Sequence, residues 1–124
     1  MAYRNNYFKN KNILISGGNR GIGLEIAKHF YKLGANIILF ARNKKKLKNI
    51  ANILKSKKNQ KVIIENCDIS KVKDIDNFFN KITKKVKKID ILINNAGIYG
   101  PKGKFEDLPW KDIKETFNIN LLGS

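Results

Sequence analysis

The chain of 124 residues is long enough for one compact domain and too short for two. Its 26 Lys and Arg residues against 10 Asp and Glu give a formal net charge of +16, which would suit a nucleic-acid partner. Only three of these cations are Arg, the residue that most often reads base edges. We therefore interpret the charge as a lysine-rich solvated surface and expect no specific nucleic-acid partner, with nucleic-acid binding as a minor alternative.

Cysteine, histidine and apolar content limit several other classes. Cys67 is the only cysteine, so no intramolecular disulfide is possible, and we expect it to be a small core side chain. His29 is the only histidine and lies within a helical pattern, so no metal site is expected. No apolar run approaches the ~20 residues needed to span a bilayer, and the start lacks the apolar core of a signal peptide. These features predict a cytoplasmic protein without a membrane partner.

The chain opens with a strand, a tight turn and a helix. Residues 1–10 are polar with scattered aromatics and predict an N-terminal arm, which leaves residues 11–124 as one domain. An apolar strand at residues 13–16 runs into two glycines, and apolar residues at helical spacing follow. Gly34 is expected to end this helix as its C′ residue.

The same unit recurs along the rest of the chain. Further strands are predicted at residues 37–41, at residues 62–64 with Cys67, and at residues 90–94. Apolar residues three and four apart predict helices around residues 47–54, 75–86 and 110–121. Trp110 is expected to mark the start of the last helix and to pack on the body. Strands that alternate with amphipathic helices predict an α/β fold, in which ligands bind beyond the carboxyl ends of the parallel strands.

A glycine-rich turn joins the first strand to the first helix. Residues 16–23 read Ser-Gly-Gly-Asn-Arg-Gly-Ile-Gly. Glycine permits a tight turn and a close backbone approach to a pyrophosphate, and the start of a helix presents N–H groups to that anion. The turn is therefore a predicted phosphate site for a dinucleotide.

The end of the second strand bears on which dinucleotide would bind. NAD-binding sheets place an acidic residue there, on the adenosine ribose 2′-hydroxyl. This chain has Ala41 followed by Arg42, so no carboxylate repels a 2′-phosphate, and Arg42 and Arg20 are available to pair with one. The hypothesis is NADP(H) in preference to NAD(H). The alternative is that both arginines are ordinary surface charges.

Small residues and amides follow the fourth strand. Residues 94–97 read Asn-Asn-Ala-Gly, which offers hydrogen-bonding groups without bulk where the nicotinamide end of a cofactor would pass. Together with residues 16–23 and with Asp68 in an Asp-Ile-Ser element, this pattern resembles the short-chain dehydrogenase/reductase family over about residues 10–123. The resemblance implies a Rossmann-type doubly wound parallel sheet with strand order 3-2-1-4, in which the C-terminal strands of the family are absent.

The resemblance also implies residue roles. In that family the glycine turn binds the pyrophosphate, the Asp after the third strand lies by the adenine, and the Asn-Asn-Ala-Gly element borders the cofactor. A helical Asn supports the proton relay, which makes Asn120 the one predicted catalytic residue. The predicted cofactor-binding residues are Ser16, Gly17, Asn19, Arg20, Gly21, Ile22, Gly23, Arg42, Asp68, Ile69, Asn94, Ala96 and Gly97.

By this resemblance the protein is an NADP(H)-dependent oxidoreductase that passes hydride between the nicotinamide and a small-molecule carbonyl or alcohol. The family's Ser and Tyr-x-x-x-Lys follow the helix that carries Asn120, where this chain has reached Ser124; Tyr7 and Lys11 have the spacing but precede the first strand. We therefore interpret the chain as the cofactor-binding half of such an enzyme, incomplete at its C-terminal end, with a homo-oligomer expected only for an intact chain. The alternative is a non-catalytic NADP(H)-binding module or a truncated nonfunctional product.

Overall fold

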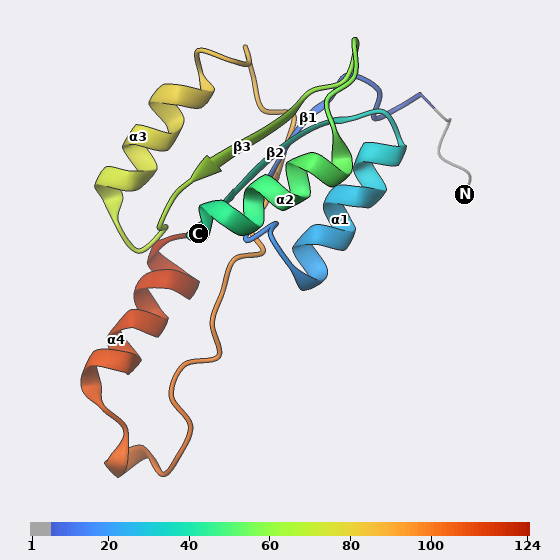
Figure 1. Cartoon of the computed structure of the whole chain (residues 1–124). Helices are drawn as coiled ribbons and strands as arrows, with labels where there is room; N and C mark the ends of the chain where they lie inside the picture. The colour runs from blue at the N-terminus through green and yellow to red at the C-terminus, as the bar shows by residue number, and fades with distance from the viewer. Residues whose placement is uncertain (1–5) are drawn as a thin grey trace.

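Four parallel strands form one sheet in the computed structural model, which describes residues 6–124 (Figure 1). The order along the sheet is β3-β2-β1-β4. The strands are β1 (Asn12–Ser16), β2 (Asn36–Ala41), β3 (Val62–Asn66) and β4 (Ile91–Ile93). Their order and their parallel pairing confirm the predicted Rossmann-type α/β fold.

Helices cover both faces of this sheet. Figure 1 shows α1 and α2 on one face and α3 on the other. The α-helices are α1 (Gly21–Lys32), α2 (Lys44–Leu54), α3 (Val72–Ile82) and α4 (Trp110–Phe117). A 3₁₀ turn, η1 (Phe105–Asp107), precedes α4, and a π-helical turn, η2 (Asn118–Leu122), follows it. Each of β1, β2 and β3 therefore leads into a helix from its carboxyl end.

Alternate residues of the central strands enter two separate cores, because successive side chains of a strand point to opposite faces. Ile13 and Ile15 of β1 belong to the core under α1 and α2. Leu14 between them belongs to the core on the other face, with Phe78 and Ile82 of α3. This division explains why β1 is apolar at residues 13–15 and β2 at residues 37–41, as strands buried on both faces must be.

The segment before β1 rests on α1 where it is described. Of the predicted arm at residues 1–10, residues 1–5 lie outside the described residues. The Phe8 ring packs edge-on against Phe30, with 5.0 Å between the ring centroids. The Asn10 N–H donates to the Gly34 carbonyl at 3.1 Å. Gly34 has a φ of +85°, the left-handed conformation expected of a C′ glycine, so the predicted end of α1 is confirmed.

The segment after β4 is much less buried than the rest of the domain. No residue of α4 is buried, and Ile119 is the one buried residue of η2. Trp110 does begin α4, but its side chain is 72% exposed, so the expectation that it packs on the body is wrong. The reason is visible in Figure 1, where the connection after β4 carries the start of α4 away from the sheet.

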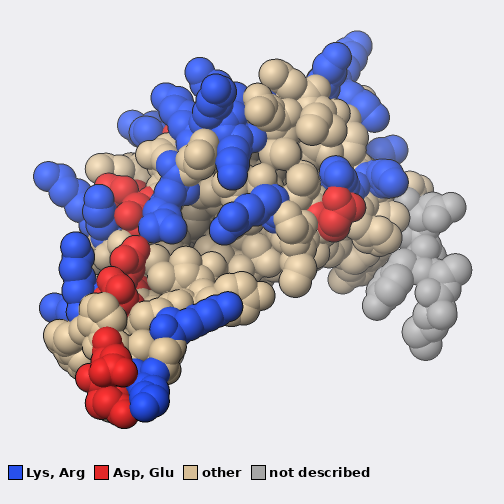
Figure 2. All heavy atoms as spheres, turned by 60° about the horizontal axis from the view of Figure 1, so that its bottom comes forward, with Lys and Arg blue, Asp and Glu red and all other residues tan. Residues whose placement is uncertain are grey.

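Lysine side chains are spread over the surface in Figure 2, with a patch of acidic side chains at the lower left end. Part of the positive charge is used in ion pairs. Lys81 of α3 and Lys85, three residues after that helix, place their Nζ atoms 3.3 and 2.8 Å from the carboxylate of Glu65 on β3. Within residues 6–124, no helix combines the length and the hydropathy needed to cross a membrane.

Candidate functional site

A cavity of about 760 Å³ opens at the carboxyl ends of the strands, where a sheet of this topology is expected to bind its ligand. Its size suits a bound small molecule. It is lined by the turn after β1, the ends of β2 and β3, the segment after β4, and Ile119 of η2. The predicted site residues that line it are Gly17, Asn19, Arg20, Gly21, Ile22, Arg42, Asp68, Ile69, Ala96 and Gly97.

The start of α1 lies at this cavity without a cap of its own. Gly17 and Gly21 have φ values of +66° and +54°, which glycine adopts readily, and they turn the chain sharply from β1 into α1. Arg20 occupies the N-cap position, and no side chain accepts a hydrogen bond from the first turn, which also lacks acidic residues. Unpartnered backbone N–H groups and the positive end of the helix dipole suit an anionic ligand.

Asn95, which the sequence prediction left out of the site, holds the glycine turn in place. Its Nδ2 donates to the carbonyls of Ser16 and Gly17 at 2.9 and 3.3 Å. In return, the Ser16 hydroxyl accepts from the backbone N–H groups of Asn95 and Ala96, both at 2.9 Å. Ser16 is buried, joins β1 to the segment after β4 and does not line the cavity; its contact with a cofactor stays a prediction.

Gly23 and Gly17 leave room for this arrangement. A Cβ at Gly23 would overlap the Asn95 Nδ2 and lie 2.8 Å from the Gly17 carbonyl oxygen. A Cβ at Gly17 would lie 2.9 Å from the Ala96 Cα. Gly23 is buried and does not line the cavity, so its place in the structure is close packing of α1 against the turn.

Cationic side chains of the cavity lie near the end of β2. Ala41 ends the strand without a carboxylate, and Arg42 and Lys46 line the cavity together with Arg20 of the glycine turn. The sequence prediction missed Lys46 because lysine is so abundant in this segment. The one signal for it is its place in the first turn of α2, four residues after Arg42. The Arg42 Nη1 lies 3.5 Å from the Oε1 of Glu115 on α4, with both side chains about half exposed.

Asp68 lines the cavity just after β3. Its Oδ1 accepts from the hydroxyl and the N–H of Ser70 at 2.7 and 3.0 Å, and its Oδ2 lies 3.9 Å from the Lys71 Nζ. Burial raises the pKa of Asp68, but the hydrogen bonds from Ser70 and the charges of Arg42 and Lys71 outweigh it and hold the pKa below its ordinary value. Asp68 is therefore an ionised hydrogen-bond acceptor at neutral pH.

Cys67 is a core residue at the wall of the cavity, as the sequence predicted. Its side chain is 2% exposed. Burial, and after it the negative charges of Asp74 and Asp68, raises the pKa of the thiol to about 11, so it carries no thiolate at neutral pH. Within the part of the chain that the structure describes, no three His, Cys, Asp or Glu side chains gather into a metal-binding group.

Asn120 lies in the π-helical turn η2 and fastens it to the segment after β4. Its side chain accepts from the Ile98 N–H and donates to the Ile98 carbonyl, both at 2.8 Å. This is a positioning contact; a part for Asn120 in a proton relay stays a prediction. Asn94 is exposed, and neither it nor Asn120 lines the cavity.

The family model for short chain dehydrogenases matches residues 11–124. The chain belongs to the short-chain dehydrogenase family. Its curated relatives are named as reductases and dehydrogenases, so the family is one of oxidoreductases.

Two curated relatives illustrate the extent of the match. The 3-oxoacyl-[acyl-carrier-protein] reductase FabG of Rickettsia typhi is 40% identical over 114 residues, which cover 92% of this chain and 44% of that protein. Chlorophyll(ide) b reductase NOL of Arabidopsis thaliana is 33% identical over 116 residues, or 90% of this chain and 32% of that protein. The chain thus spans less than half the length of these short-chain dehydrogenases.

Solved structures of short-chain dehydrogenases share the fold. NAD⁺-bound xylitol dehydrogenase superposes with a TM-score of 0.87 at 26% identity, over 94% of this chain and 45% of that one. An alcohol dehydrogenase of the archaeon Thermococcus sibiricus, in complex with 5-hydroxy-NADP, has a TM-score of 0.86 at 30% identity, over 93% and 48% of the two chains. The neighbours therefore include complexes of both dinucleotide types.

Proposed function

We propose that this chain is the cofactor-binding part of an NADP(H)-dependent oxidoreductase that passes hydride between the nicotinamide and a small-molecule carbonyl or alcohol carbon. One observation supports the choice of NADP(H): the end of β2 offers Arg42 and Lys46 to the cavity, with Ala41 where a carboxylate would favour NAD(H). A 2′-phosphate there meets two cations, and Arg42 is able to bind it through two donors at once. Arg20 adds a third positive charge to the same cavity.

The remaining parts of the cavity suit the rest of the dinucleotide. The uncapped first turn of α1 binds the pyrophosphate through backbone N–H groups. Asp68, ionised at neutral pH, accepts a hydrogen bond from the adenine side. Ala96 and Gly97 form a wall of small residues beside the nicotinamide. When bound, the cofactor supplies or accepts the hydride.

A comparison of NADPH and NADH binding tests this proposal. We expect fluorescence titrations of the purified protein to give a clearly lower Kd for NADPH. Arg42→Ala is expected to raise the Kd for NADPH about ten- to a hundredfold, because a hydrogen bond to a charged group contributes about 1.5–3 kcal/mol. The Kd for NADH should change little, since NADH has no 2′-phosphate.

Lys48→Ala is the matched control. Lys48 is exposed on the same helix as Lys46 and carries the same charge, but it does not line the cavity. If Arg42→Ala and Lys48→Ala raise the Kd for NADPH equally, binding depends on the overall positive charge of the protein and not on Arg42. If the unmodified protein binds NADPH and NADH with equal affinity, the proposal is overturned. NADPH binding without turnover of any carbonyl substrate would favour the non-catalytic binding module.

A further inference from the structure

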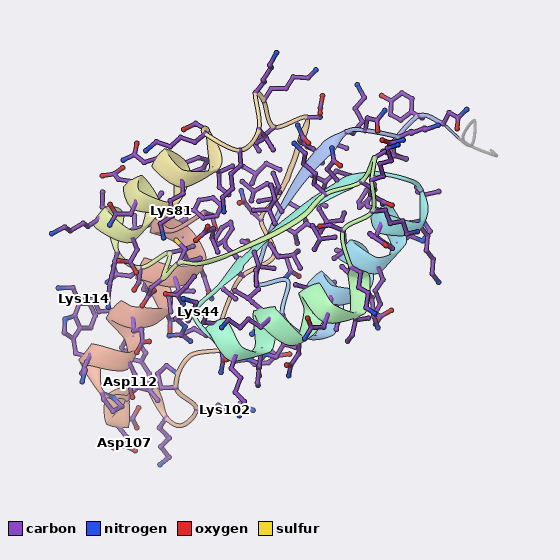
Figure 3. All side chains as sticks on the ribbon, turned by 45° about the horizontal axis from the view of Figure 1, so that its top comes forward. Lys44, Lys81, Lys102, Asp107, Asp112 and Lys114 are labelled. Carbon is purple, nitrogen blue, oxygen red and sulfur yellow. The ribbon has the colours of Figure 1, made fainter. Side chains whose placement is uncertain are left out.

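An ion pair between Arg42 and Glu115 links α4 to the body of the domain. Figures 1 and 3 both show the start of α2 beside α4, and the pair joins Arg42, in the connection between β2 and α2, to Glu115 of α4 across 73 positions of sequence. Within residues 6–124, no other ion pair or side-chain hydrogen bond joins α4 to the sheet or to α2. Glu115 does not itself line the cavity, so its link to the cavity runs through Arg42, which does.

The partner of Glu115 is the residue on which the proposed choice of NADP(H) depends. The Arg42 Nη1 lies 3.5 Å from the Glu115 Oε1, so any phosphate bound by Arg42 lies within a few ångströms of the Glu115 carboxylate. Both side chains are about half exposed, so solvent screens their attraction and a stronger anion is able to displace the carboxylate. Lys46 and Arg20, the other cations of the cavity, have no ion pair within the described residues.

We propose that Glu115 sets the strength of discrimination between NADP(H) and NAD(H), by competing with the 2′-phosphate for Arg42. This inference rests on the proposed function. In the free protein, Glu115 neutralises Arg42; on binding, the 2′-phosphate either displaces the carboxylate or shares the guanidinium with it. Displacement costs the ion pair, and sharing places two anions side by side, so both routes weaken binding of the phosphorylated nucleotide. A nucleotide without the 2′-phosphate leaves the pair undisturbed.

Adenosine fragments provide a test that needs neither the nicotinamide nor turnover. Binding of adenosine 2′,5′-bisphosphate and of 5′-AMP is measured by calorimetry at low ionic strength for the protein and its Glu115→Gln variant. We expect Glu115→Gln to lower the Kd for the bisphosphate about two- to fivefold, the range of an exposed ion pair, and to leave the Kd for 5′-AMP unchanged. Glu115→Lys should lower the former Kd further. Added salt should shrink both effects.

Asp112→Asn is the control for charge. Asp112 is exposed on α4, three residues before Glu115 (Figure 3). The substitution Asp112→Asn removes one negative charge from the same helix, as Glu115→Gln does, but it leaves the partner of Arg42 in place. If Asp112→Asn lowers the Kd for the bisphosphate as much as Glu115→Gln does, the effect comes from the net charge of the protein and the inference is overturned. Unchanged or weaker binding of the bisphosphate by both Glu115 variants, with unchanged melting temperatures, would also overturn it.

The two proposals fail in different ways. If the unmodified protein binds adenosine 2′,5′-bisphosphate no better than 5′-AMP, the NADP(H) preference itself is wrong. If it prefers the bisphosphate but Glu115→Gln does not increase that preference, the preference stands and the competition by Glu115 is wrong.

Discussion

Two helices begin at the same edge of the sheet, and their first turns are completed in different ways. At α2 the Asn43 side chain accepts a hydrogen bond from the Lys46 N–H at 2.9 Å, so the protein caps the helix itself. At α1 Arg20 occupies the corresponding position, and no side chain caps the first turn. The protein therefore caps α2 itself, beside the cations proposed to bind the 2′-phosphate, and leaves the first turn of α1 for the proposed pyrophosphate to complete.

The support behind the two starts differs as well. Behind α1, the Asn95 side chain and the Ser16 hydroxyl tie the glycine turn to the segment after β4 with four hydrogen bonds of 2.9–3.3 Å. The start of α2 has its own cap at Asn43, and the Asn66 side chain of β3 also donates to the carbonyls of Ala41 and Arg42 just before it. Both helix starts are therefore tied to distant segments, and only α2 is capped by its own sequence as well.

Filling the space behind the start of α1 should have the largest effect. In Gly23→Ala, the new Cβ overlaps the Asn95 amide and crowds the Gly17 carbonyl, so the turn must move. We expect a loss of about 1–3 kcal/mol or more in the free energy of unfolding and no measurable NADPH binding. Urea denaturation and a fluorescence titration measure the two quantities.

Gly21→Ala is a control that distinguishes steric overlap of a new Cβ from the strain of a positive φ. No atom lies within 4 Å of a Cβ at Gly21, but its φ is +54°, so the substitution brings only backbone strain of roughly 1–2 kcal/mol. A Gly23→Ala variant that is no worse than Gly21→Ala would contradict the close packing described for α1.

Removing the contacts behind the α1 start should have a smaller effect. Asn95→Ala leaves the Ser16 and Gly17 carbonyls without the donor that they share, which is expected to cost about 1–3 kcal/mol of stability and to weaken NADPH binding. Asn94→Ala, at the exposed neighbouring position, should leave the stability unchanged. Equal effects of the two substitutions would show that the hydrogen bonds of Asn95 do not matter.

Removing the cap of α2 should lower stability and largely spare binding. Asn43→Ala is expected to cost about 1 kcal/mol, because the Lys46 N–H loses its acceptor. Asn43→Asp keeps an acceptor and should retain the stability. The Kd for NADPH should rise less than in Arg42→Ala; a rise as large would mean that Asn43, which also lines the cavity, contributes to binding as much as Arg42 does.

The smallest expected effect is an acid dependence that has nothing to do with either helix start. Burial raises the pKa of Glu65, but the hydrogen bonds and charges of Lys85 and Lys81 outweigh it and hold the pKa below its ordinary 4.5. A carboxylate with a lowered pKa stabilises the fold fully above its ordinary pKa, and this stability is lost as the pH falls through the lowered value. The free energy of unfolding should therefore fall below about pH 4.5, and by less in Glu65→Gln. Identical acid profiles of the two proteins would contradict this account.

The fold could be predicted because it depends on local patterns. Uninterrupted apolar runs marked the strands, and the glycine turn before a helical pattern marked the start of α1. The strand bounds differ by one or two residues: Cys67, assigned to the third strand, lies just beyond β3, which ends at Asn66. Cys67 is buried in the core that lies between the sheet and α3, which explains why the sequence pattern placed it in the strand.

The site could be predicted only in part, because its polar contacts join distant segments. Asn95 stood inside a recognised motif, yet its partner Ser16 is 79 positions away, and nothing local showed that the amide holds the turn. Glu115 gave no signal at all, since its partner Arg42 lies 73 positions away. Trp110 was misplaced because the sequence shows where a helix starts and not whether its apolar face meets a partner.

The most direct test of the open start of α1 is an NADPH titration followed by amide NMR. The account predicts the largest shifts at the backbone N–H groups of residues 21–23, together with shifts around Arg42, and little change on α3 and at the lysines of residues 84–88 that follow it. The largest shifts on α3, or shifts spread evenly over the lysine-rich surface, would contradict the account and leave only the general positive charge to explain binding.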